Sequence, residues 1–284
     1  MRERVDIFEV GPRDGLQNER HTIPTADKVA LIDMLSACGF GRIEVASFVS
    51  PKWVPQMADG AQVLADIRRV DGTAYAALTP NMKGYEAAIA ANADEISIFA
   101  SASEGFSKAN INCTIDESLA RFAQVAEAAR AVRKPMRGYV SCVTDCPYDG
   151  RVKPAQVARV TEALINLGCY EVSLGDTIGK GKPKTIAKML EAALDVAPAI
   201  RLAGHYHDTG GRALDNIATS LELGLRVFDT SVAGLGGCPY APGASGNVAT
   251  DAVVDLVEAR GFDTGIDFFK LAQVTEFAKG FSSG

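Results

Sequence analysis

"KPAQVARVTEALINLGCYEVSLGD", residues 153–176, joins a helical stretch to a short apolar strand and contains one full repeat of the chain's pattern. Residues 153–168 carry apolar side chains at helical spacing, begin at Lys-Pro and end at a glycine, as helix ends commonly do. Residues 170–176 then form a short strand-like run that includes an aromatic and a β-branched residue and ends at Asp176. A helix that leads directly into a strand is typical of a sheet of parallel strands.

The same unit recurs along the whole chain. Strand-like runs are expected at residues 4–10, 41–49, 72–78, 94–100, 136–143, 170–176, 200–208 and 225–234, with helical stretches between them such as 25–39, 114–132, 153–168, 182–197 and 211–224. Eight such units predict an α/β fold of the (β/α)8 TIM barrel class, whose usual length is roughly 250 residues. An open doubly wound sheet is less favoured, because no GxGxxG turn follows the first strand. We expect one domain over residues 1–284 with a short C-terminal helical extension.

Composition excludes several classes of partner. The net charge of -6 and the pI of about 5.2 argue against a nucleic acid or an anionic membrane as the partner. No apolar run approaches the roughly 20 residues of a membrane span, and the N-terminus enters a strand pattern without a signal peptide. We therefore expect a cytoplasmic protein. Its six cysteines show no paired CxxC and are expected to be reduced.

Polar residues accompany several predicted strands, mostly near the C-terminal ends where a barrel of this class carries its chemistry. Arg13 and Asp14 follow the first strand, Glu44 lies in the second, Arg137 lies near the start of the fifth, and Asp176 ends the sixth. Structural roles stay open for all of them. Arg13 and Asp14 could form a surface ion pair at the Arg-Asp-Gly turn, and Glu44 could be a buried acid paired with a base. Arg137 could stack on a tyrosine or hold a carboxylate, and Asp176 could cap the next turn.

His205 and His207 lie two positions apart on the seventh strand and therefore point to the same face. Their Cα atoms are expected roughly 6.6 Å apart, which suits one metal ion. The chain has three histidines, so two at one strand end favour a metal site over a structural pair. Asn247 precedes a helical stretch, where the ordinary role of asparagine is the helix N-cap, and a ligand role can coexist with it.

A further candidate is Cys238, in "SVAGLGGCPYAPGASGN" at residues 231–247. A thiol among glycines and prolines is in the wrong surroundings for core packing, so we interpret it as a chemical group. The basic stretch "GKGKP" at 179–183 lacks the spacing of a phosphate-binding loop and is expected to be a mobile basic loop.

Five motifs together carry a resemblance to a known family. They are "GPRDGLQNE" at 11–19, "RGYVSCV" with the following "CPYDG" at 137–150, "LGDTIGKG" at 174–181, "GHYHDT" at 204–209, and the cysteine-bearing loop at 231–247. The chain resembles the 3-hydroxy-3-methylglutaryl-CoA lyases, among the metal-dependent lyase barrels related to the isopropylmalate and homocitrate synthases. The resemblance runs from about residue 5 to about residue 260. The loop is its most specific part, since it separates the lyases from the synthases.

The resemblance implies a metal-dependent carbon–carbon lyase that splits this acyl-CoA thioester into acetyl-CoA and acetoacetate, and a homodimer. It implies four ligands of one divalent cation, which are Asp14, His205, His207 and Asn247. Two imidazoles and two oxygen donors without a thiolate favour Mg²⁺ or Mn²⁺, and Zn²⁺ or Co²⁺ also fits this donor set.

The resemblance also assigns roles in the reaction. Arg13 is the electrophilic residue beside the thioester carbonyl, Asp14 or His205 is the base, and Cys238 is the acid. Residues that shape the substrate site are Glu44, Arg137 and Asp176. The loop "SEGFSKANIN" at 103–112, together with Lys180 or Lys182, is a candidate for holding the CoA nucleotide. Two alternatives stay open. One is a related aldolase or lyase acting on another 3-hydroxyacyl-CoA or on a 2-oxo acid, and the other is a catalytically silent barrel that serves as a scaffold.

Overall fold

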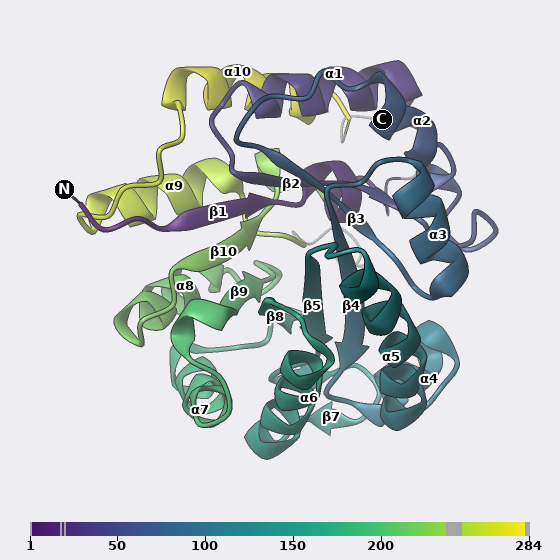
Figure 1. The fold of residues 1–284 in the computed structure, drawn as a ribbon. Helices are drawn as coiled ribbons and strands as arrows, with labels where there is room; N and C mark the ends of the chain where they lie inside the picture. The colour runs from purple at the N-terminus through teal and green to yellow at the C-terminus, as the bar shows by residue number, and fades with distance from the viewer. Residues whose placement is uncertain (1, 18, 20, 237–245, 282–284) are drawn as a thin grey trace.

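The eight predicted strands form a closed barrel of parallel strands in the computed structural model of the chain (Figure 1). The structure describes residues 2–17, 19, 21–236 and 246–281. In order around the barrel, the strands are β1 (Asp6–Glu9), β10 (Val227–Thr230), β9 (Leu202–Tyr206), β8 (Glu171–Asp176), β5 (Met136–Ser141), β4 (Glu95–Ser101), β3 (Ala74–Leu78) and β2 (Arg42–Ser47), which pairs with β1. The predicted TIM barrel class is therefore confirmed.

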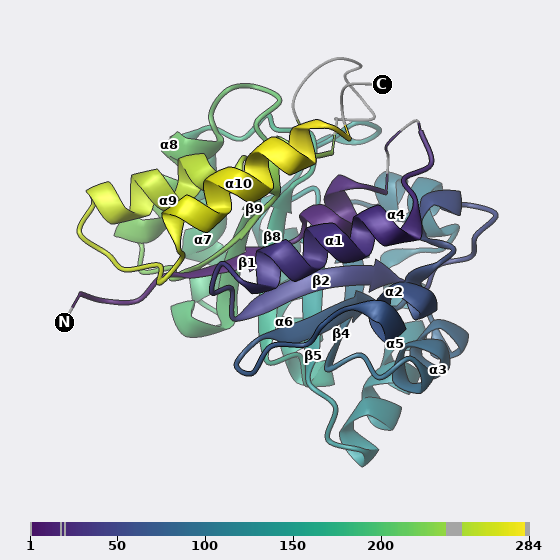
Figure 2. The ribbon, with the colours of Figure 1, turned by 90° about the horizontal axis from the view of Figure 1, so that it is seen from above.

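Helices surround this barrel and cover its outer face (Figures 1 and 2). They are α1 (Thr25–Ser36), α2 (Gly60–Asp66), α3 (Met82–Ala90), α4 (Glu104–Ile111), α5 (Ile115–Ala131), α6 (Pro154–Leu167), α7 (Pro183–Leu194), α8 (Ala213–Glu222), α9 (Thr250–Ala259) and α10 (Phe268–Lys279). Local chemistry fixes their ends. At α5, Thr114 and Glu117 form a capping box, and α6 ends at Gly168 with a φ of 104°, a conformation that glycine adopts without strain.

The predicted C-terminal helical extension is α10, which lies alongside α1 in both views (Figures 1 and 2). Its buried residues Leu271, Val274 and Ala278 recur at helical spacing and face the rest of the protein. Asp267 caps the helix by accepting hydrogen bonds from the backbone N–H groups of Phe269 and Lys270. The helix thus covers part of the N-terminal repeat.

One local expectation was wrong. The stretch at 103–112, expected to be a loop, contains the helix α4, because the Ser103 hydroxyl accepts a hydrogen bond from Phe106 N–H and caps it. After β5 the chain also forms a small hairpin of β6 (Asp145–Cys146) and β7 (Gly150–Arg151). Among the helices of the described part of the chain, none is long and apolar enough to cross a membrane.

The interior of the barrel holds charged and polar side chains beside a small apolar cluster of Phe8, Val10 and Ala76, whereas the main apolar core lies between the strands and the helices. Arg137 on β5 contacts Asp229 on β10, and Tyr139 on β5 contacts Glu44 on β2. These strands are not neighbours, so the contacts cross the barrel interior. Buried charges are costly unless they are paired, and pairing across the barrel holds these side chains in fixed positions. The barrel thereby supplies a rigid set of charged groups below its mouth.

Candidate active site

Asp14, His205 and His207 form a cluster that is able to hold a metal ion. One ligand atom from each lies within 4.8 Å of the others. His205 belongs to β9 and His207 follows it, so both rings leave the same face of the chain, with centroids 5.3 Å apart. Asp14 comes from the π-helical turn η1 (Gly11–Gly15) after β1. The two histidines predicted to act together are therefore side by side, and Asp14 joins them.

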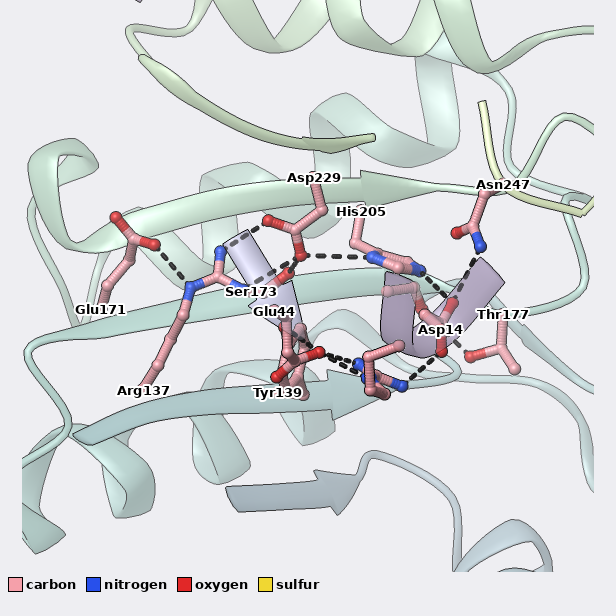
Figure 3. Close-up of polar contacts among 12 residues, drawn as sticks. Asp14, Glu44, Arg137, Tyr139, Glu171, Ser173, Thr177, His205, Asp229 and Asn247 are labelled. Carbon is pink, nitrogen blue, oxygen red and sulfur yellow. Dashed lines mark hydrogen bonds and ion pairs between the residues drawn. The ribbon is translucent and has the colours of Figure 1, made fainter. Parts of the chain in front are cut away.

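Asn247 reaches the same cluster from the segment before α9. An isolated antiparallel bridge pairs Asn247 with His207, and Asn247 Nδ2 donates a hydrogen bond of 2.9 Å to Asp14 Oδ2. The residue that caps α9 is Ala249, without a side-chain hydrogen bond. The ordinary N-cap role is thus absent, and the amide of Asn247 faces the cluster (Figure 3).

The electrostatics of the cluster favour an ionised Asp14 and an uncharged His207 near neutral pH. Burial opposes ionisation of Asp14, but the charges of Arg13 and of the two histidines outweigh it and lower its pKa to about 2. Burial and the neighbouring His205 lower the pKa of His207 to about 4. His207 is therefore a neutral imidazole at pH 7. Among the described residues its Nδ1 atom is buried without a hydrogen-bond partner.

Arg13 lies beside this cluster and is held by two carboxylates. Its guanidinium pairs with Asp14 and with Glu44, and only 5% of its surface is exposed. Tyr139 donates a hydrogen bond of 3.1 Å to the same oxygen of Glu44, and Arg13 lies 5.5 Å from the Tyr139 ring centroid. The surface ion pair considered for Arg13 and Asp14 is excluded by this burial. Glu44 Oε1 has no hydrogen-bond partner among the described residues.

Arg137 lies deeper in the barrel than these groups and is fully buried. Its guanidinium donates to both oxygens of Asp229, at 2.7 and 3.1 Å, and its Nε donates to Glu171 at 2.7 Å. In Figure 3 Asp229 lies between Arg137 and His205. Arg137 therefore holds carboxylates inside the barrel and also lies 5.0 Å from the Tyr139 ring centroid, so both structural roles that the sequence left open are present.

Asp176 ends β8 and organises the loop that follows. Its Oδ1 accepts a hydrogen bond from the Thr144 hydroxyl and its Oδ2 accepts one from Gly181 N–H, both at 2.8 Å. Burial raises the pKa of Asp176 above its ordinary value. The turn-capping role considered for this residue is present. Cys238, the expected acid, lies outside the described residues.

Asp229 and Tyr139 are central to the site, although neither was among the candidate residues predicted from the sequence. Asp229 stands in the strand "VFDT", where an acid between buried residues needs a positive or hydrogen-bonding partner. That mismatch is the signal that would have identified Asp229. Tyr139 carried no comparable signal, because an aromatic residue fits any strand.

Comparisons with known proteins identify relatives that match almost the whole chain. The family model described as HMGL-like matches residues 4–278. Hydroxymethylglutaryl-CoA lyase, mitochondrial, of Bos taurus is 56% identical over 97% of this chain and 85% of its own length. The 3-hydroxy-3-isohexenylglutaryl-CoA/hydroxy-methylglutaryl-CoA lyase of Pseudomonas aeruginosa is 56% identical over 95% of this chain and 90% of its own length. The crystal structure of the HMG-CoA lyase from Brucella melitensis superimposes with a TM-score of 0.99 at 63% identity, covering 99% of this chain and all of that one.

Proposed function

The chain belongs to the HMGL-like family, and from that membership we propose that it is a carbon–carbon lyase that cleaves hydroxymethylglutaryl-CoA to acetyl-CoA and acetoacetate. The observation that carries the proposal is the cluster of Asp14, His205 and His207 with Arg13 beside it. The reaction removes a proton from the tertiary hydroxyl, breaks the adjacent carbon–carbon bond and protonates the resulting thioester enolate. Each of these steps moves charge that the site must stabilise.

The residues present fit a divalent cation. His207 has a buried ring nitrogen without a partner among the described residues, and Asp14 is held ionised. The proposed ligands are Asp14, His205, His207 and Asn247, the last through its amide oxygen. Their donor set of nitrogen and oxygen atoms suits Mg²⁺ or Mn²⁺. Such a cation, when bound, supplies Lewis-acid stabilisation and fixes the orientation of the substrate oxygens.

The protein's own groups are proposed to manage the remaining charges. Arg13 is held in place by Glu44 and Asp14, so its guanidinium is preorganised to stabilise negative charge on the thioester oxygen. A preorganised donor of this kind contributes about 3 kcal/mol to the transition state. Asp14 is the proposed base for the hydroxyl proton, because a carboxylate that binds the cation through one oxygen keeps a second oxygen as an acceptor, whereas His205 as a ligand has no second lone pair.

Protonation of the enolate carbon is assigned to Cys238. An ordinary thiol has a pKa near 8.5 and is mostly protonated at neutral pH, so it is a competent acid without special tuning. This assignment comes from the sequence motif of residues 231–247 and is independent of the described structure. Glu44 and Asp176 are proposed to shape the substrate site, whereas Arg137 acts through the carboxylates that it holds.

A second candidate substrate is a thioester with a longer substituent at C3. The printed name of the Pseudomonas aeruginosa relative includes 3-hydroxy-3-isohexenylglutaryl-CoA beside the methyl compound. Both substrates undergo the same cleavage, so the chemistry of the site does not separate them. Acyl-chain length is therefore a question for a direct assay.

The test uses protein purified without a histidine tag and a panel of 3-hydroxyacyl-CoA thioesters and 4-hydroxy-2-oxo acids, assayed with and without Mg²⁺. Cation-dependent release of acetoacetate from hydroxymethylglutaryl-CoA supports the proposal. Turnover confined to another member of the panel would assign a related lyase or aldolase. Bound cation without any product would favour the scaffold.

A further inference from the structure

Asp229 is the one carboxylate in the described residues that contacts both Arg137 and a proposed metal ligand. It lies on β10 and only 2% of its surface is exposed. Its Oδ1 accepts from Arg137 at 2.7 Å, and its Oδ2 accepts from Arg137 at 3.1 Å and from the Ser173 hydroxyl at 2.7 Å. The same Oδ2 lies 3.2 Å from His205 Nδ1. Three side chains thus fix the carboxylate at one place inside the barrel.

The charge on the Asp229 carboxyl group decides whether His205 Nδ1 donates or accepts the hydrogen bond between them. The Arg137 guanidinium donates to both Asp229 oxygens, at 2.7 and 3.1 Å, and this bidentate contact is that of an ion pair with an ionised carboxylate. An ionised carboxylate has acceptor sites only. The hydrogen bond at 3.2 Å therefore requires a proton on His205 Nδ1.

The opposite nitrogen of His205 faces the cluster. His205 Nε2 lies 3.9 Å from Asp14 Oδ2, and in Figure 3 the ring lies between Asp229 and Asp14. A neutral ring with its proton on Nδ1 leaves the lone pair on Nε2. That lone pair is the group that a cation at the cluster needs.

We propose that Asp229 is a positioning residue that keeps the proton of neutral His205 on Nδ1, so that Nε2 is free to bind the cation, and that Arg137 and Ser173 hold the Asp229 carboxylate for this task. The inference rests on the proposed function, because it takes the cluster as a cation site. Outer groups that orient a metal-bound imidazole in this way change metal affinity by 10–100-fold.

The two carboxylates that pair with Arg137 can be changed in a matched pair of variants. Its guanidinium is shared between two buried carboxylates, Asp229 and Glu171, and Glu171 also pairs with Arg42. Asp229→Asn and Glu171→Gln each remove one negative charge from this network without a change in shape. Asp229 contacts His205, whereas Glu171 contacts the two arginines. A general effect of disturbing the core would appear in both variants.

Asp229→Asn reverses the direction of the hydrogen bond between residue 229 and His205. The asparagine oxygen is retained by the donors of Arg137, which places the amide NH₂ towards Ser173 and His205. The NH₂ group donates, so His205 Nδ1 must accept and its proton moves to Nε2. An aspartate-to-asparagine change beside a catalytic histidine is known to act through the wrong tautomer.

The experiment records ¹⁵N–¹H correlations of the histidine rings near pH 8 in wild type and in both variants, and the chain's three histidines keep the spectrum simple. Mn²⁺ affinity is measured on the same apo proteins by calorimetry. We expect a protonated His205 Nδ1 in wild type and Glu171→Gln, an unprotonated Nδ1 in Asp229→Asn, and a 10–100-fold weaker Mn²⁺ affinity in Asp229→Asn alone. An unprotonated Nδ1 in wild type, or equal losses of affinity in the two variants, would overturn the proposal.

Two further outcomes are decided by the same measurements. If Asp229→Asn does not fold, the wild-type spectrum alone tests the position of the His205 proton. If wild type binds no cation but carries the Nδ1 proton, the cation site fails while the role of Asp229 in setting the tautomer stands. The failure of the proposed function and the failure of this inference are therefore separate results.

Discussion

Asn247 Nδ2 donates a hydrogen bond of 2.9 Å to Asp14 Oδ2, although 233 positions separate the two residues along the chain. The contact exists because β1 and β10 are neighbours when the barrel closes, so the segments that follow them meet. Asp14 also pairs with Arg13, and its carboxylate is therefore held from two sides. The contact thus brings two of the proposed ligand residues together, with the amide nitrogen of Asn247 facing Asp14.

The first prediction uses this contact. Asn247→Asp replaces a donor with a second carboxylate at hydrogen-bond distance from Asp14, and two like charges so close repel. We expect the Tm of the apo protein to fall, and Mg²⁺ to raise the Tm of the variant by more than it raises the Tm of wild type. Thermal unfolding with and without Mg²⁺ measures both changes. Equal shifts by Mg²⁺ in the two proteins would contradict a cation at this contact.

The second prediction concerns metal removal. Excess EDTA should abolish turnover and added Mg²⁺ or Mn²⁺ should restore it, because orientation of the substrate oxygens is lost with the ion. His207→Ala should weaken Mn²⁺ binding by an order of magnitude or more. The control is His21→Ala, which changes the third and exposed histidine and should leave affinity unchanged. Full activity in excess EDTA excludes the metal-dependent reaction.

The third prediction concerns Arg13. Arg13→Met removes the preorganised guanidinium and should lower kcat by roughly 10²–10⁴ while the metal affinity stays nearly the same. Arg13→Lys should recover only part of the rate, because a lysine cannot contact Asp14 and Glu44 with the same planar fork. The control is Arg68→Met, which breaks the exposed pair with Asp33. A kcat within a few-fold of wild type would limit Arg13 to a structural role.

The fourth prediction concerns Cys238. Cys238→Ala should lower kcat by 10² or more with little change in Tm, because the proton for the enolate carbon is lost. The described cysteines Cys38, Cys113, Cys142, Cys146 and Cys169 are all buried, and burial raises the pKa of the Cys38 and Cys169 thiols to about 12. A thiol reagent should therefore label one cysteine per chain first, and substrate should protect it.

Cys113→Ala is the control for Cys238→Ala and should keep the wild-type kcat. Cys113 lies after α4, away from the cluster, and its thiol is not assigned to the reaction. Peptide mapping after labelling identifies the modified residue. If Cys238→Ala cleaves substrate at the full rate and exchanges solvent deuterium normally into the product methyl group, the proton comes from another group.

The sequence predicted the parts of the site that depend on short-range order. The two-residue period of a strand is enough to place His205 and His207 on one face, and the barrel class places Arg13 and Asp14 at the end of β1. The helix α4 was missed because its capping residue Ser103 and its polar surface resemble a loop when the chain is considered alone.

Contacts across the barrel could not be predicted in this way. The carboxylate partners of Arg137 lie 34 and 92 positions away, whereas only Tyr139, two positions away, could be foreseen as a neighbour from the sequence. The side that a guanidinium faces depends on which strands oppose each other once the barrel has closed. Asp229 therefore became identifiable as a positioning residue only from the three-dimensional structure.

The fifth prediction concerns Glu9, a fully buried residue at the end of β1. Its Oε1 accepts hydrogen bonds from the backbone N–H groups of Gly11 and Val232, and its Oε2 accepts one from the Thr250 hydroxyl. Glu9 thus connects the turn that carries Arg13 and Asp14 with the segment after β10. Burial raises its pKa to about 7, because the three hydrogen bonds offset only part of the desolvation.

A carboxyl group whose folded pKa lies above its unfolded value binds its proton more tightly in the folded state, so its contribution to stability is full below the unfolded pKa and is lost as the pH rises. For Glu9 this window runs from about pH 4.5 to about pH 7, and the shift corresponds to a loss of about 3 kcal/mol.

Glu9→Gln stays neutral throughout. We expect wild type and Glu9→Gln to have similar Tm values near pH 5, and the variant to melt several degrees higher near pH 8. The difference in Tm between the two proteins across this range cancels the titration of groups common to both, including the histidines. A variant that is less stable by the same margin at both pH values would show that Glu9 is ionised throughout and that its three hydrogen bonds outweigh its burial.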